Sequence, residues 1–230
     1  MSMKKIVFAF IFSSVIASAN AQEFGLSFSY FLPRNGYFST PISPFSLRGV
    51  GVNLNDYFAL QTGASLYRMS GLNIIDMPFE SKEALLGPNF TIFIPVELVL
   101  QFRGKSAQLD LKGGAFAFHG FGQKLNYGNF DRSIRAYENW SVANAELTFD
   151  NHPGFGYQGG IEFTVDVTRQ FAVSLEANYL LGTAKFPLKG SYTGAANGGT
   201  LTTRTVNYED AKVDFTGLEI SIGVIMRGGR

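Results

Sequence analysis

One pattern limits what this chain can fold into: large apolar residues recur at every second position in eight separate segments. In residues 171–182, for example, Glu176 stands between Leu175 and Ala177. A period of two is that of a β-strand with two chemically different faces. The eight predicted strands are residues 23–32, 45–54, 58–66, 91–103, 107–115, 155–167, 171–182 and 218–227.

The connections between these strands alternate between short and long. Three short turns are NLNDYF, RGKS and VTRQ, whereas the four long connections, residues 33–44, 69–90, 119–153 and 183–212, are rich in Gly, Asn, Ser and Pro. Long loops at one end and short turns at the other indicate an even-stranded up-and-down barrel. We therefore predict an all-β fold, an eight-stranded antiparallel transmembrane β-barrel with long extracellular loops and short periplasmic turns. The phase of the last strand changes before Leu218, which predicts a bulge near Gly217.

The composition of the two faces indicates which one lies outside. Only 16% of the residues are charged, against about 25% in soluble domains, and the polar face is mostly Gly and Ser. Small residues suit a narrow lumen better than a solvated surface. Aromatic residues near the strand ends predict two interfacial girdles, formed by Tyr30, Phe45, Tyr57, Phe58, Phe102, Phe155, Tyr157, Phe171 and Phe215.

The first residues predict export. Residues 1–21 contain two lysines, a short apolar run and the small-residue ending Ala19-Asn20-Ala21, which together are typical of a cleavable signal peptide. Residues 22–230 form the predicted barrel domain, whose formal charge falls from +1 to −1 without Lys4 and Lys5. The sequence has no cysteine, so it has no disulfide or thiolate chemistry. The near-zero charge also argues against nucleic acid as a partner.

Several local motifs add a resemblance. They are the export junction ANAQ, the strand FTIFIPVELVLQF, and the turn-strand units DYFALQTGASLY and RQFAVSLEANYLLG. With these, the chain resembles the small outer-membrane β-barrel proteins of Gram-negative bacteria, the porin family or PorT-like group. The resemblance implies a location in the cell outer membrane, with lipid and the barrel-assembly machinery as partners. It also implies a possible role in a secretion apparatus.

Charged residues on the polar face form the candidate site. They are Glu97, Lys112, Glu162, Glu176, Glu219, Arg48, Asp110, Asp166 and Arg103. One interpretation is an ion-pair network that fills a narrow lumen, because buried charges tend to be paired. The other is a polar path or proton-sensitive constriction for small cations, because carboxylates outnumber cations.

Enzymatic chemistry has little support in the sequence. The chain has two histidines, His119 and His152, which bracket the longest loop, and Ser133 and Ser141 lie between them. Their spacing matches neither a nucleophile elbow nor a two-histidine zinc helix. We therefore expect no cofactor, and a non-enzymatic outer-membrane protein with an occluded lumen that serves envelope structure, surface contact or limited solute passage. The alternatives are a narrow cation-preferring channel, a lipid-modifying enzyme, and a soluble exported barrel that binds a hydrophobic ligand.

Two loop segments have predicted structure of their own. Residues 133–140, SIRAYENW, read as a short helix or an aromatic contact patch. Residues 183–212 read as an extended hairpin with a flexible tip, because GSYTGAANGGTLTTRTV has β-branched runs on both sides of a Gly- and Asn-rich centre.

Overall fold

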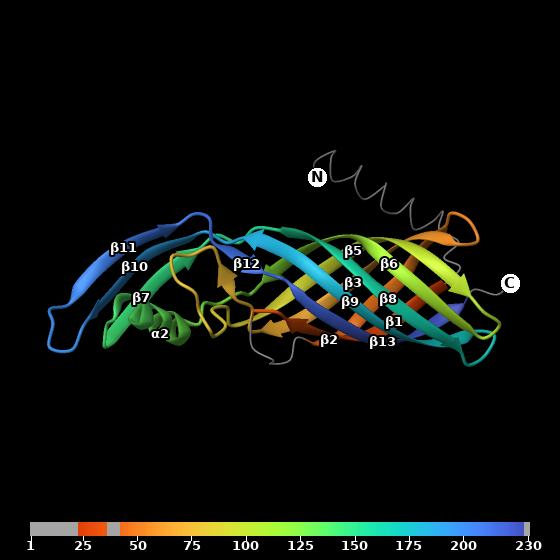
Figure 1. The fold of residues 1–230 in the computed structure, drawn as a ribbon, viewed down its shortest axis with the longest axis horizontal. Coiled ribbons are helices and arrows are strands. Elements are labelled where there is room, and N and C mark those ends of the chain that lie inside the picture. Colours follow the sequence, from red (N-terminus) through yellow and green to blue (C-terminus); the bar gives the residue numbers. More distant parts are fainter. Residues whose placement is uncertain (1–22, 36–41, 228–230) are drawn as a thin grey trace, which may run out of the picture.

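The structure is a computed structural model, and it describes residues 23–35 and 42–227. The predicted signal peptide, residues 1–21, lies outside the described residues, and so do residues 36–41 and 228–230. Figure 1 shows an elongated molecule with a strand-built barrel at one end and a smaller lobe at the other.

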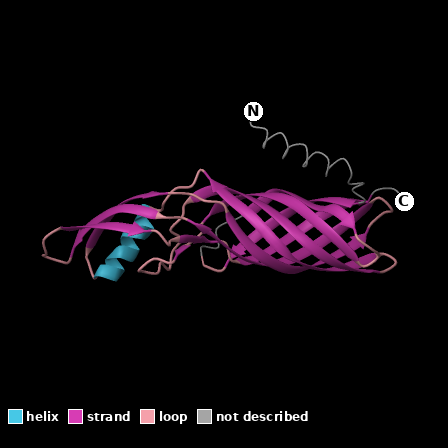
Figure 2. Ribbon diagram, turned by 90° about the horizontal axis from the view of Figure 1, so that it is seen from above, coloured by secondary structure: helices cyan, strands magenta, loops and turns pink. Residues whose placement is uncertain are grey.

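Eight antiparallel strands close into the barrel (Figures 1 and 2). Each strand pairs with its neighbours in chain order, and the last pairs with both β1 and β9, which closes the wall. The predicted fold class is therefore confirmed, with all eight strands near their expected positions. They are β1 (Glu23–Pro33), β2 (Ile42–Asn53), β3 (Phe58–Ser70), β5 (Pro88–Arg103), β6 (Ala107–Phe121), β8 (Gly154–Asp166), β9 (Phe171–Lys185) and β13 (Gly217–Arg227).

The alternation places bulky apolar side chains on the outside of the wall. Along β5, residues alternate strictly between exposed and buried for most of the strand, and Leu175 at mid-strand in β9 is 56% exposed. Glu176, next to it, is 2% exposed and faces inward. An outside of this kind, apolar along whole strands, is the reverse of a soluble barrel.

The pairing of strand β2 explains why the alternation of apolar and polar residues is weak in this part of the sequence. Its pairing with β3 shifts register twice, between Ile42 and Ser46 and again between Leu47 and Val50. Gly49, within the second shift, has a φ of 71°, a left-handed conformation that glycine adopts without a steric cost. The extra residues interrupt the period of two.

The predicted bulge near Gly217 is wrong. The short strand β12 (Lys212–Asp214) and β13 pair with β9 in one unbroken register, and the amide of Phe215 continues the ladder by donating to Gly182. Val213 and Phe215 are apolar because they face the interior, where both are buried. Phe215 is therefore not part of an interfacial girdle, and the side chain of Phe45 lies outside the described set.

The long loops build the lobe. Strands β7 (Val142–Phe149), β10 (Leu188–Ala195) and β11 (Thr202–Tyr208) form a three-stranded sheet, and helix α2 (Tyr127–Glu138) packs against β7. The predicted hairpin is confirmed as β10 and β11. The predicted helix exists but begins six residues earlier. No helix in the described part of the chain is both long and apolar enough to cross a membrane.

Local signals set the ends of α2. The side chain of Asn126 accepts a hydrogen bond from the amide of Asn129 at its start, and Asn139, with a φ of 55°, ends it in a left-handed cap. Phe130 and Ile134 are buried with Ala145 and Leu147 of β7. The short strand β4 (Ile74–Ile75) pairs with β12 at the junction between lobe and barrel.

The lobe sheet extends the barrel wall. Strands β7 and β10 extend β8 and β9 beyond the long-loop end of the barrel. The β7–β10 ladder continues the β8–β9 ladder with a register offset of one residue. Between the two ladders the amides of Asp150 and His152 donate to Pro187 and Lys185. One hydrogen-bonded ribbon therefore runs from the short-turn end of the barrel into the lobe.

Candidate functional site: the barrel lumen

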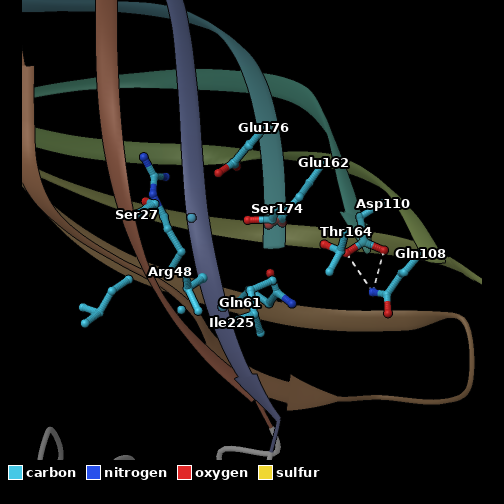
Figure 3. Close-up of a pocket in the computed structure, with 15 residues that line it drawn as sticks. Ser27, Arg48, Gln61, Gln108, Asp110, Glu162, Thr164, Ser174, Glu176 and Ile225 are labelled. Atoms are coloured by element: carbon cyan, nitrogen blue, oxygen red, sulfur yellow. Dashed lines mark hydrogen bonds between the residues drawn. The ribbon is translucent and has the colours of Figure 1, made fainter. Parts of the chain in front are cut away.

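The half of the lumen nearest the short turns holds a polar cavity. It has an empty volume of about 480 Å³, part of it open to solvent. Figure 3 shows Asp110, Glu162 and Glu176 on one side, with Arg48 on the other. Gln108 donates its amide to both oxygens of Asp110, at 2.8 and 2.9 Å.

Lys112 holds the acidic side of this cavity together. Its Nζ lies 2.6 Å from Glu162 and 2.8 Å from Glu176, and these two glutamates are direct cross-strand partners on β8 and β9. Like charges placed opposite each other destabilise a sheet. The ammonium group therefore neutralises a repulsion that the strand register creates.

A second ion pair lies inside the lumen and spans strand β1, which separates β2 from β13. Arg48 from β2 pairs with Glu219 from β13, and both side chains are almost fully buried. Asn178 links the two ion-pair groups, because its amide donates to Glu176 at 2.9 Å and to Glu219 at 3.0 Å. The cross-strand partner of Asn178 is Gly160, where a Cβ would lie 1.9 Å from the Asn178 amide oxygen. Glycine thus leaves the space that this bridge needs.

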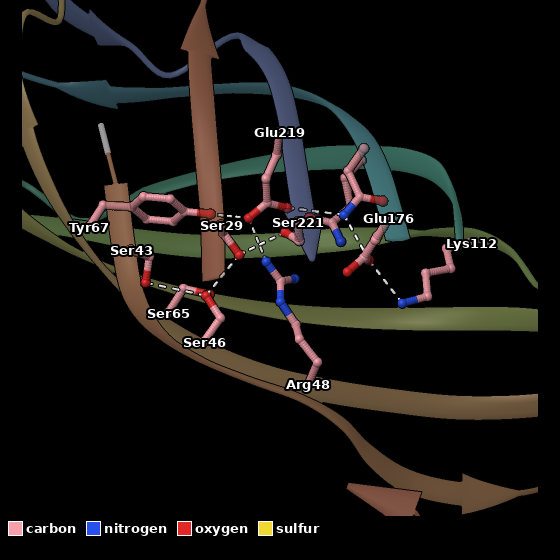
Figure 4. A network of polar contacts seen from close by, with 12 residues as sticks. Ser29, Ser43, Ser46, Arg48, Ser65, Tyr67, Lys112, Glu176, Glu219 and Ser221 are labelled. Carbon is pink, nitrogen blue, oxygen red and sulfur yellow. Dashed lines mark hydrogen bonds and ion pairs between the residues drawn. The ribbon is translucent and has the colours of Figure 1, made fainter. Parts of the chain in front are cut away.

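A row of hydroxyls fills the lumen beside Arg48. Ser29 bonds to Ser221 at 2.7 Å and to Ser46 at 3.0 Å, and Ser46 donates to Ser65 at 2.8 Å. Ser43 also contacts Ser46 (Figure 4). These serines satisfy one another's hydrogen-bonding groups across four strands. Small polar side chains therefore fill this part of the lumen.

Of the remaining predicted lumen residues, Asp110 and Glu97 lie beside this centre, because Asp110 is the cross-strand partner of Glu162 and Glu97 interacts electrostatically with Lys112 and Glu176. Glu97 is 3% exposed and accepts a hydrogen bond from Gln158. Asp166 pairs with Arg227 at 2.8 Å, and Arg103 donates to Gln101 at 3.1 Å. These four residues lie close to the short-turn ends of their strands. The structure therefore brings five of the nine predicted residues into one connected network: Arg48, Lys112, Glu162, Glu176 and Glu219.

The other half of the lumen is filled by aromatic rings that the sequence interpretation missed. Phe215 stacks on Phe118 at 4.5 Å and on Phe31 at 4.7 Å between ring centroids, and Phe116 lies 4.9 Å from Phe93. All five side chains are buried. They stand on the inward phase of their strands near the long-loop end, and that phase was the signal available in the sequence. The lumen therefore has a charged layer and an aromatic layer.

Among the described residues, neither histidine is hydrogen-bonded to Ser133 or Ser141. The hydroxyl of Ser133 bonds to Ser81 at 2.9 Å and that of Ser141 donates to Ala195 at 3.1 Å. His119 is exposed on the outward face of β6. Among the described residues, no group of three or more His, Cys, Asp or Glu side chains could hold a metal ion.

A closed antiparallel wall that is apolar outside, and charged and aromatic inside, defines the class of protein: an eight-stranded barrel of the membrane type. Its fold is similar to the crystal structure of the outer membrane protein OprG from Pseudomonas aeruginosa. The TM-score is 0.54 at 14% identity, over 90% of this chain and 96% of that chain. A major outer membrane protein from Thermus thermophilus has a TM-score of 0.45 at 10% identity, over 89% and 98%. No protein-family model matches the sequence, and no curated protein matches it either.

Proposed function

We propose that this chain is a non-enzymatic integral protein of the outer membrane, whose barrel anchors the lobe at the cell surface. The apolar outside of the wall carries this proposal. Exposed Leu, Ile, Val and Phe side chains cover all the barrel strands, and an apolar surface that continues around a whole barrel suits lipid. The likeness in fold to OprG, an outer membrane protein, supports the same location.

The lumen is closed in this proposal, so the barrel is not an open channel. Ion pairs and serine hydroxyls fill its centre, and stacked rings fill the half nearest the loops. An ion that crossed the barrel would have to displace Phe215 and its neighbours. The excess of carboxylates alone is therefore weak support for a cation channel.

Surface contact is then left to the lobe. The sheet face turned away from α2 carries hydroxyl, amide and carboxylate side chains in register, as Thr193 pairs with Asn144 and Thr203, and Ser191 pairs with Glu146 and Thr205. Loops held on a rigid scaffold commonly carry binding function. We infer that the lobe contacts other surface molecules, after the barrel-assembly machinery has inserted the chain.

Two measurements test the proposal. Expressed full-length protein should be found in the outer-membrane fraction and be released only by detergent. Folded protein in a planar bilayer should produce no conductance steps. Recovery as a soluble periplasmic protein would contradict the location, and regular steps would contradict the closed lumen.

A further inference from the structure

The outward faces of the eight barrel strands carry few polar ionisable groups. Among the described side chains, the charged or imidazole residues on these faces are Arg68 on β3, His119 on β6 and Lys185 on β9. Carboxylates are absent from the same described faces. The charged groups described on the outside of the wall are therefore all basic.

All three residues lie at the same end of the barrel. Each of their strands runs from a short turn toward the long loops, and each residue stands within the last three positions of its strand. Strands β3, β6 and β9 alternate with β5 and β8 in the wall. Because neighbouring strands are about 4.8 Å apart, roughly 10 Å separates one basic residue from the next. We call Arg68, His119 and Lys185 the cationic rim.

The rim charges are not neutralised within the described part of the protein. Neither Arg68 nor Lys185 has an ion-pair partner there. Lys185 is the cross-strand partner of Lys212, which is itself paired with Asp76 at 2.8 Å. Because Asp76 is engaged by Lys212, Lys185 has no carboxylate partner of its own among the described residues.

The apolar surface ends at the rim. The cross-strand partner of Arg68 is Phe90, whose exposed ring stacks on exposed Phe121 at 5.7 Å between centroids. Aromatic rings beside an outward Arg mark the depth at which a membrane changes from hydrocarbon to headgroups. Anionic groups at that depth complement the unpaired cations.

We propose that the cationic rim binds the phosphate groups of lipid A, the phosphorylated glycolipid of the outer leaflet. This inference rests on the proposed location in the outer membrane. Guanidinium and ammonium groups both bind phosphate well, and the imidazole of His119 adds an N–H donor. Each basic residue near a lipid surface contributes about 1 kcal/mol, so loss of Arg68 and Lys185 together should weaken binding about 30-fold.

The experiment compares two double variants of the full-length chain. Arg68→Gln with Lys185→Gln removes the rim charges, whereas Lys105→Gln with Arg169→Gln removes two exposed cations from the short turns, with the same change in net charge. Each protein is folded in neutral detergent and titrated with diphosphorylated lipid A, dephosphorylated lipid A or phosphatidylglycerol. The thermal unfolding midpoint gives the apparent affinity.

We expect the wild type and the turn variant to bind diphosphorylated lipid A alike, and the rim variant to bind it about 30-fold more weakly. Equal affinity of the rim variant and the wild type would overturn the inference. An equal response to phosphatidylglycerol or dephosphorylated lipid A would also overturn it. Flotation with lipid A-free phosphatidylcholine vesicles separates the two proposals: a wild type that does not insert refutes the membrane location, and insertion without phosphate dependence refutes the rim alone.

Discussion

The hydroxyl of Tyr67 donates a hydrogen bond to Glu219, and this contact joins the two layers of the lumen. The ring of Tyr67 belongs to the aromatic layer, where it meets Phe31 and Phe93 edge-on. Its oxygen reaches the carboxylate that also pairs with Arg48. One side chain therefore couples apolar packing to the ion-pair network.

Tyr67→Phe tests this coupling. The substitution keeps the ring but leaves a buried carboxylate with one donor fewer, which should cost about 1–3 kcal/mol of unfolding free energy. Urea unfolding of the folded barrel in micelles measures the loss. Tyr157→Phe on the exposed outer face serves as the control and should change stability by less than about 0.5 kcal/mol.

Lys112→Met should be more damaging. It removes the ammonium group between Glu162 and Glu176, and breaking a buried pair by removing one partner costs about 3–5 kcal/mol. Adding Glu162→Gln should recover part of the loss, because it removes one of the two opposed charges. Equal unfolding midpoints for the single and double variants would show that carboxylate repulsion is not the cause.

The aromatic layer should act as the seal of the lumen. Replacing Phe116, Phe118 and Phe215 with Ala removes the rings that fill the half near the long loops. We expect conductance steps in a planar bilayer where the wild type has none, with a preference for cations because carboxylates dominate the layer below. The outward substitution Leu175→Ala is the control, and a silent triple variant that is correctly folded would refute the seal.

The lipid-facing surface can be tested with one charge. Leu175→Arg places a cation at mid-strand among apolar neighbours, which should destabilise the barrel by about 2–4 kcal/mol in a bilayer. Chemical unfolding from vesicles measures the change. Leu201→Arg, at an exposed position between the lobe strands β10 and β11, should be close to neutral; a similar cost at both sites would mean that Leu175 does not face lipid.

The lobe should lose stability in alkali. Burial and the hydrogen bond from Tyr192 to Glu138, at 2.6 Å, raise the pKa of Tyr192, and burial, with smaller effects of Tyr137 and Glu138, raises the pKa of Tyr208 to about 12. The same phenols in the unfolded chain titrate near pH ~10. Their stabilising contribution is therefore complete below that pH and is lost as the pH rises toward 12.

Trp140 offers the readout for this pH dependence. It is the single tryptophan of the chain and lies 5.7 Å from Tyr192 between ring centroids. Its fluorescence should report unfolding of the lobe above pH 10, and Tyr192→Phe should reduce the slope of stability against pH. If Tyr192→Phe leaves the slope of stability against pH unchanged, the loss of stability in alkali is not caused by ionisation of Tyr192.

Much of the barrel was predictable because the period of two is a local property. Leu175 and Glu176 differ in chemistry and therefore in face, and the same comparison along each strand gave the wall and its orientation. The inward rings were missed because Phe93 and Phe116 are apolar on the polar phase, which resembles noise in the pattern. The wrong prediction of a bulge near Gly217 has the same origin. Val213 and Phe215 point inward like the polar residues of β13, but they are apolar.

The contacts of the network were beyond prediction for another reason. Strand phase predicted the inward direction of Glu219, whereas the blurred pattern of β2 left the direction of Arg48 open. Their pairing depends on the register shifts in β2 and on the closure of β13 against β1. Residues 171 positions apart in sequence meet only in the complete barrel. The lobe was predicted in part, because the hairpin of β10 and β11 is local whereas its pairing with β7 is not.

The continuous ribbon through β7–β8 and β9–β10 has a mechanical consequence. A molecule bound near residues 196–201 and pulled away from the cell would load this ribbon along the length of its strands. The hydrogen bonds of the ladder would then share the force together instead of opening one at a time. The connection between the lobe and the barrel should therefore resist force applied along the strands. Residues 196–201 lie outside these ladders, so substitutions there should not weaken the connection.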